Sequence, residues 1–255
     1  MAVGSDWVSK PITDKRFINL MGRMGNFDMS AGPWIAGGCI RKLWQGKSWV
    51  DEDVDLFFPD RETFKEYVDN LQAKYKNNMR SYVTLIDQNT LEFNDLELTV
   101  TVPFTERPIT ALEQAKTRLK PKKVEDCPHI DSVYSSDNAI TFSFSGFHTL
   151  VGEGSLLKIQ AICRDFPPTA RHLVNNFDWT VCQFVSDGRY MWAPRAAVKD
   201  LEENQIVHNT ENTRAIKVPR LMKYLAYGFD VSDEIMMKTI RYLEDGKGRE
   251  VDDDY

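Results

Sequence analysis

Apolar and polar positions in the first third of the chain predict a strand–helix–strand–helix order. A helical pattern over about 14–21 comes first, and a short apolar run over 34–36 then predicts a strand. Apolar residues at helical spacing follow over 39–45. Residues 53–58 predict a second strand, and residues 60–75 predict a helix that begins at an aspartate able to cap it.

Strand patterns dominate the middle of the chain. Short apolar or alternating runs predict strands over 81–86 and 91–102, and a helical pattern covers 109–119. Alternation returns over 135–144 and 156–162, with glycines between the two runs. This middle part therefore combines a β-rich stretch with a return to longer strands.

The last third predicts a helix, a strand and another helix. Prolines in the first turn favour a short helix over 167–174. An apolar run over 177–184 predicts a strand, with Asp178 near its start. A helix over 219–229, ended by Gly228, follows.

Two carboxylates mark the strand at 53–58 as a candidate site. Alternate side chains of a strand share a face, so Asp53 and Asp55 project together. Magnesium prefers oxygen ligands, and the nearby glycines Gly37 and Gly38 would let backbone N–H groups approach phosphates. The alternative is a solvated acidic run at 51–53. The apolar residues that follow favour a buried strand and a magnesium–triphosphate site.

These motifs together resemble a known superfamily. A strand running into Gly37-Gly38, a helix with Arg41, and a strand with Asp53-x-Asp55 resemble the nucleotidyltransferases named for DNA polymerase beta. The nearest branch contains the head domains of poly(A) polymerases and CCA-adding enzymes. The stretch around 158–183 is also similar to uncharacterised nucleotidyltransferase-like proteins, many of them phage-encoded.

The resemblance implies a fold and a division of the chain. The expected fold is α+β, with a nucleotidyltransferase-type mixed sheet, flanking helices and a β-rich insertion. Residues 1–75 and 131–230 would form the two parts of the core, with the insertion at 76–130. A C-terminal helix and an acidic tail would occupy 231–255.

The resemblance also implies the metal ligands. Asp53, Asp55 and Asp178 would be the catalytic carboxylates and would bind two Mg²⁺ or Mn²⁺ ions, with an NTP as substrate. Asp178 has a second interpretation, in which it caps a neighbouring backbone amide. Burial of a carboxylate without a compensating partner is costly, which favours the functional interpretation.

Candidate phosphate-binding groups lie in the same regions. The resemblance implies that the nucleotide is bound by backbone amides and cationic side chains, namely Gly37, Gly38, Arg41, Lys47, Arg220 and Lys223. Arg220 and Lys223 could instead form a solvated stripe of their helix.

A basic run inside the predicted insertion is the candidate acceptor-binding segment. It comprises Lys116, Arg118, Lys120, Lys122 and Lys123. Such a run is often only a solvated surface. The alternative, and more specific, hypothesis is that it binds the phosphates of the acceptor.

The composition of the chain restricts the range of binding partners that we expect. The 255 residues carry a net charge of −6, so contact with nucleic acid would need a local basic patch. No window resembles a membrane span or a secretory signal, which predicts a cytoplasmic protein, in the host cytoplasm if phage-encoded. The four cysteines form no C-x-x-C pair, so neither zinc nor a disulfide framework is expected.

The function expected from the resemblance is metal-dependent transfer of an NMP from an NTP to a hydroxyl acceptor. RNA or tRNA is the favoured acceptor. The alternatives are an NMP-transferring enzyme that modifies proteins, and an inactive binding or regulatory protein with the same fold.

Overall fold

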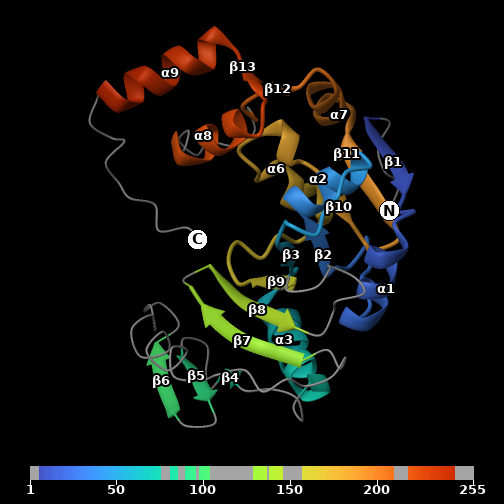
Figure 1. Ribbon diagram of the computed structural model, residues 1–255, viewed down its shortest axis with the longest axis vertical. Coiled ribbons are helices and arrows are strands. Elements are labelled where there is room, and N and C mark those ends of the chain that lie inside the picture. Colours follow the sequence, from blue (N-terminus) through green and yellow to red (C-terminus); the bar gives the residue numbers. More distant parts are fainter. Residues whose placement is uncertain are drawn as a thin grey trace.

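The computed structural model describes residues 6–75, 81–85, 90–95, 98–103, 129–136, 138–145, 157–209 and 218–244. Its main element is a mixed eight-stranded sheet with helices around it (Figure 1). The strand order is β1-β11-β10-β2-β3-β9-β8-β7. The strands of this sheet are β1 Trp7–Pro11, β2 Trp34–Ala36, β3 Val54–Phe57, β7 His129–Ser135, β8 Ala139–Ser145, β9 Leu157–Ile162, β10 Val185–Ser186 and β11 Tyr190–Pro194.

Two smaller sheets and the helices complete the fold. A three-stranded sheet contains β4 Ser81–Leu85, β5 Thr90–Asp95 and β6 Leu98–Pro103, and a two-stranded sheet pairs β12 Gln205–Ile206 with β13 Asp230–Val231. The helices are α1 Lys15–Met24, α2 Gly38–Trp44, α3 Arg61–Tyr75, α6 Ala170–Asn175, α7 Arg195–Glu202, α8 Val218–Ala226 and α9 Asp233–Glu244. None of these described helices is long and apolar enough to cross a membrane.

The register of the large sheet separates two faces. Directly paired residues share a face, and a single row of pairs crosses all eight strands: Ser9, Trp192, Val185, Ala36, Asp55, Gln160, Thr141 and Tyr134. We call this the site face. The adjacent row, which includes Ile35, Leu56, Ala161 and Ile140, faces the opposite side, where the main core lies.

Different elements cover the two faces. The main core joins the opposite face to buried residues of α1 and α3, such as Leu20, Phe64 and Val68. On the site face, Leu173 and Val174 of α6 pack with Trp34, Ala36 and Val185 in a separate apolar cluster. The site face is therefore covered in its middle by α6, while its polar side chains lie toward β9, β8 and β7.

Most of the predicted elements are confirmed. The predicted α+β class with a large mixed sheet is present, and β2, α2, β3 and α3 lie where the pattern of the first third placed them. The run over 91–102 forms two antiparallel strands, β5 and β6, instead of one. The helix expected at 109–119 and the acidic tail beyond 244 lie outside the described residues.

Two predictions in the second half need correction. Residues 177–184 do not form a strand. They contain a 3₁₀ turn, Thr180–Cys182, and one isolated bridge from Trp179 to His208. The whole segment is buried apart from its first residue, and an apolar run without alternation does not distinguish a strand from a buried turn. Strand β7 begins at His129, inside the predicted insertion, yet belongs to the large sheet.

Candidate active site

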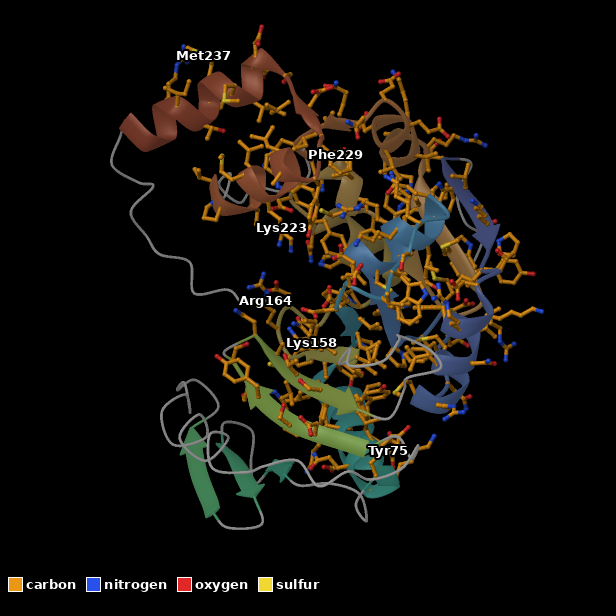
Figure 2. The ribbon with its side chains drawn as sticks, in the orientation of Figure 1. Tyr75, Lys158, Arg164, Lys223, Phe229 and Met237 are labelled. Atoms are coloured by element: carbon orange, nitrogen blue, oxygen red, sulfur yellow. The ribbon has the colours of Figure 1, made fainter. Side chains whose placement is uncertain are left out.

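A cavity of about 590 Å³ lies over the polar part of the site face. Its floor comes from β3, β9 and β8, and its other walls come from α2, the segment around α6, and α8. Figure 2 shows Lys223 on the α8 side of this region and Lys158 and Arg164 on the side of the sheet. The cavity therefore joins residues from both ends of the sequence.

Asp53 and Asp55 lie together in the cavity, as the sequence predicted. Asp55 is in β3, paired in register with Gln160 of the parallel strand β9. Gln160 Nε2 donates a hydrogen bond to Asp53 Oδ2 at 2.9 Å. The two carboxylates are thus fixed by the strand pairing and by an amide side chain that sequence reasoning missed.

The site disfavours two negative charges. Burial raises the pKa of Asp55 to about 7, and the neighbouring charge of Asp53 contributes to the rise. Burial also raises the pKa of Asp53, while the cations Lys158 and Lys223 oppose that shift. A divalent cation would relieve this repulsion, because it would supply positive charge between the carboxylates.

The Gly-Gly turn allows two carboxylates, those of Asp55 and Glu52, to lie close against the backbone. Gly37 has φ +90° and precedes α2, and a β-carbon there would lie 2.9 Å from Asp55 Oδ2. A β-carbon at Gly38 would lie 2.5 Å from Glu52 Oε2, and Glu52 itself pairs with Lys42 at 2.9 Å. Any side chain at either position would therefore displace an acidic group of the site.

Arg41 lies in a cage of aromatic rings. It is 3% exposed, and its guanidinium lies 5.1 Å from the ring centre of Tyr224, 5.6 Å from Tyr227 and 5.5 Å from Phe229. Its Nη1 atom has no hydrogen-bond partner within the described part of the chain. Arg41 thus lines the cavity and also joins α2 to the α8 segment, while its binding of a nucleotide stays a prediction.

Asp178 lies in the same cavity, where it forms an ion pair with Arg220. Its Oδ2 atom is 2.9 Å from Nε of Arg220, and its Oδ1 atom accepts a hydrogen bond from the amide of Trp179 at 3.0 Å. The positive charge of Arg220 also opposes the rise in the pKa of Asp55. Asp178 therefore lines one cavity together with Arg220 and Lys223, and phosphate binding by these two cations stays a prediction.

Other predicted site residues lie elsewhere. Lys47 follows α2, is exposed, and does not line the cavity. The basic run from Lys116 to Lys123 lies outside the described residues. Sequence reasoning missed Lys158 and Arg164, although the alternation of β9 would have placed Lys158 on the face of Gln160.

The donor set fits a divalent cation only in part. Among the described residues, no three His, Cys, Asp or Glu side chains converge as a metal site. Asp53 and Asp55 provide a two-carboxylate half-site, and magnesium is commonly held by one or two carboxylates together with substrate phosphates. The residues present therefore fit a metal that arrives with a triphosphate. The described cysteines Cys39, Cys163 and Cys182 are buried free thiols.

This α+β fold, with paired carboxylates beside a glycine turn, is compatible with the class of nucleotidyltransferase-like proteins. The chain itself belongs to the Gabija anti-defense 2 family, whose model matches residues 9–204. No curated protein matches the sequence.

The solved structures most similar to the chain include three of CCA-adding enzymes. The complex with CTP has a TM-score of 0.44 and 15% identity, covering 94% of this chain and 46% of the enzyme. The Thermotoga maritima enzyme with tRNA has a TM-score of 0.48 and 14% identity over 94% and 46% of the two chains. An apo form has a TM-score of 0.41 and 12% identity over 91% and 42%. The chain spans less than half the length of each enzyme, and at these values the likeness transfers no activity to it.

Proposed function

We propose that the protein is a metal-dependent nucleotidyltransferase, which moves an NMP from an NTP to a hydroxyl acceptor. One observation supports this most directly: Asp53 and Asp55 lie side by side in a cavity that also carries cations. These cations are Arg41, Lys158, Arg164, Arg220 and Lys223. Carboxylates for a metal next to cations for phosphates are what a metal–triphosphate substrate requires.

Each group has a defined task in this proposal. Asp53 and Asp55 hold the metal, which when bound would lower the pKa of the acceptor hydroxyl and neutralise the departing pyrophosphate. The turn at Gly37-Gly38 admits the phosphates close to the backbone. Arg220 and Lys223 approach from α8 and offset the triphosphate charge. Asp178 keeps the Arg220 guanidinium in place through their ion pair.

The acceptor in this proposal is an RNA. Its support is the basic run Lys116, Arg118, Lys120, Lys122 and Lys123 on an acidic chain, because such a segment would attract a polyanion. A second candidate comes from the family name, which assigns its members to Gabija anti-defense. On that ground, NMP transfer onto a protein component of Gabija would be the anti-defense activity.

The nucleotide site is tested by thermal unfolding with NTP and Mg²⁺ or Mn²⁺. Ligand at a hundredfold excess over Kd should add about 2.7 kcal/mol to the free energy of unfolding. The variant carrying Asp53→Asn and Asp55→Asn should show no ligand-dependent shift. Asp51→Asn, an exposed neighbour outside the cavity, is the control with the same type of charge change. An equal shift in the double variant would refute the metal site.

The acceptor is tested separately. The protein is incubated with labelled ATP or CTP, Mg²⁺, total RNA and total protein that includes Gabija components. Label in RNA that declines in the Lys120→Ala, Lys122→Ala, Lys123→Ala variant supports the RNA acceptor. Label in protein alone, unchanged in that variant, refutes it and supports the second candidate.

A further inference from the structure

A second cavity, of about 890 Å³, lies near the β1 end of the large sheet. Its walls come from β1 and β11, from α1 and the following segment to Ser30, and from the β10–β11 turn. Helix α6 contributes Ala170 and Arg171 to this cavity and Leu173 to the candidate active site. The two cavities share no lining residue, so the second one is a distinct space on the other side of α6.

The walls of the second cavity are rich in aromatic side chains. Trp192 of β11 lies in the row of the site face, where it pairs with Ser9 of β1. Trp7, two residues before Ser9, lies on the same face. Both indoles are partly exposed, and Phe27 and Met29 line the same space. Partly exposed tryptophans around a cavity are typical of sites that bind flat apolar groups.

A glycine in the last turn of α1 borders this cavity. Gly22 lies within Lys15–Met24, where glycine costs about 1 kcal/mol of helix stability relative to alanine. No packing contact demands glycine here, since a β-carbon at Gly22 would have no atom within 4 Å. Since Gly22 lines the cavity, a longer side chain at this position is expected to narrow it.

The charged side chains around the cavity are two carboxylates and two guanidiniums, and they differ in their partners. The carboxylate of Asp28 accepts hydrogen bonds from the amide and hydroxyl of Ser30 at 2.6 and 2.5 Å. The carboxylate of Asp187 accepts from two backbone amides of its own turn at 2.9 and 2.8 Å. The guanidiniums of Arg171 and Arg189 are exposed and make no hydrogen bond or ion pair with the residues described in this structure. Both carboxylates thus accept hydrogen bonds from their own turns, whereas the two guanidiniums remain able to donate hydrogen bonds to an anion.

We propose that this second cavity binds a small molecule with a planar aromatic ring and an anionic group. The ring would stack among Trp7, Trp192 and Phe27, and the anionic group would lie near Arg171 and Arg189. Nucleoside monophosphates and aromatic carboxylates both have this chemistry. The proposal is independent of nucleotidyl transfer, because no residue of the candidate active site takes part.

Titration with the fluorescent probe 8-anilinonaphthalene-1-sulfonate, which combines a planar naphthalene ring with an anionic sulfonate, tests the site on the full chain without metal or NTP. We expect one saturable site per chain. Gly22→Leu should weaken binding roughly tenfold or more by filling the cavity, and Arg171→Gln with Arg189→Gln should weaken it by a similar factor. Gly22→Leu introduces a better helix former, so its melting temperature should not fall.

Matched variants separate this site from other apolar surfaces. Met236→Ser with Met237→Ser alters exposed residues of α9 and should leave the titration unchanged, as should Asp53→Asn with Asp55→Asn. Competition by AMP or by indole-3-carboxylate then identifies the natural source of the anion. The proposal is overturned if Gly22→Leu leaves probe binding intact, if the α9 variant abolishes it, or if neither competitor displaces the probe at millimolar concentration.

Discussion

Asp55 carries a charge that its surroundings disfavour, which makes the stability of the metal-free protein depend on pH. Its folded pKa of about 7 lies above the ordinary value of 3.8, so between these values the folded chain holds a proton that the unfolded chain has released. The free energy of unfolding should therefore fall as pH rises from about 4 to 7, by on the order of 4 kcal/mol.

Urea denaturation in EDTA at a series of pH values measures this dependence. Asp55→Asn should be more stable than the wild type at pH 7 and should show a flatter profile. Asp51→Asn should keep the wild-type slope, because Asp51 is exposed. Parallel profiles for the wild type and Asp55→Asn would show that the carboxyl titrates normally.

The ion pair between Asp178 and Arg220 can be separated from a metal-ligand role of Asp178. If the carboxylate mainly holds the guanidinium, Asp178→Asn should weaken NTP binding and cost about 1–2 kcal/mol of stability. Arg220→Met should do the same, and the double variant should be no worse than either single one. Independent, additive losses in NTP affinity would favour direct metal binding by Asp178.

At the scale of elements, α8 is attached to the rest of the molecule partly through Arg41. The guanidinium contacts Tyr224 of α8 together with Tyr227 and Phe229 just after it, and each such contact is worth about 0.5–2 kcal/mol. Arg41→Ala should therefore accelerate amide hydrogen exchange in 218–226, roughly tenfold for each 1.4 kcal/mol lost.

Replacement of Arg41 by lysine provides an intermediate variant for the same exchange measurement. Arg41→Lys keeps the charge but lacks the planar group, so its effect on exchange should be intermediate. Lys47→Ala removes an exposed cation outside the cavity and should leave exchange in α8 unchanged. Uniform acceleration over the whole chain in Arg41→Ala would indicate global destabilisation, and would contradict a specific role in holding α8.

The elements that sequence predicted well have a strong local signal. The glycine turn and the alternation of Asp53 and Asp55 depend on neighbouring residues, and both appear as expected. The strand predicted for 177–184 was wrong. This segment is buried on all sides, so its sequence lacks the alternation of apolar and polar residues that distinguishes a strand from a buried turn. The aromatic cage could not be predicted, since it joins Arg41 to rings more than 180 residues away.

At the scale of the whole molecule, the candidate site needs both ends of the sequence. Arg220, Lys223, Tyr224 and Tyr227 line the cavity, yet they lie beyond residue 204, where the family model ends. A chain shortened to residues 1–209 should lose the stabilisation by NTP and Mg²⁺, because two cations of the cavity, Arg220 and Lys223, and all three rings around Arg41 are gone. Thermal unfolding with and without ligand measures this.

A second shortened chain, which ends after α8 and not before it, controls for the loss of chain length. A chain of residues 1–231 retains α8 and Phe229 but lacks α9, and it should keep the ligand-dependent shift. If the chain of residues 1–209 is folded and still shows the full shift, the α8 residues do not contribute to nucleotide binding.

The parallel pairing of β3 with β9 also has a kinetic consequence. The hydrogen bond from Gln160 to Asp53 closes a separation of 107 residues, whereas β2 and β3 pair locally. Contacts of high sequence separation form slowly, because chain entropy is lost before they contribute stability. At about 5–20 residues per second, a ribosome needs roughly 5–20 s to make the intervening chain. A nascent chain would therefore carry its two carboxylates for seconds before the strand that fixes them has been made.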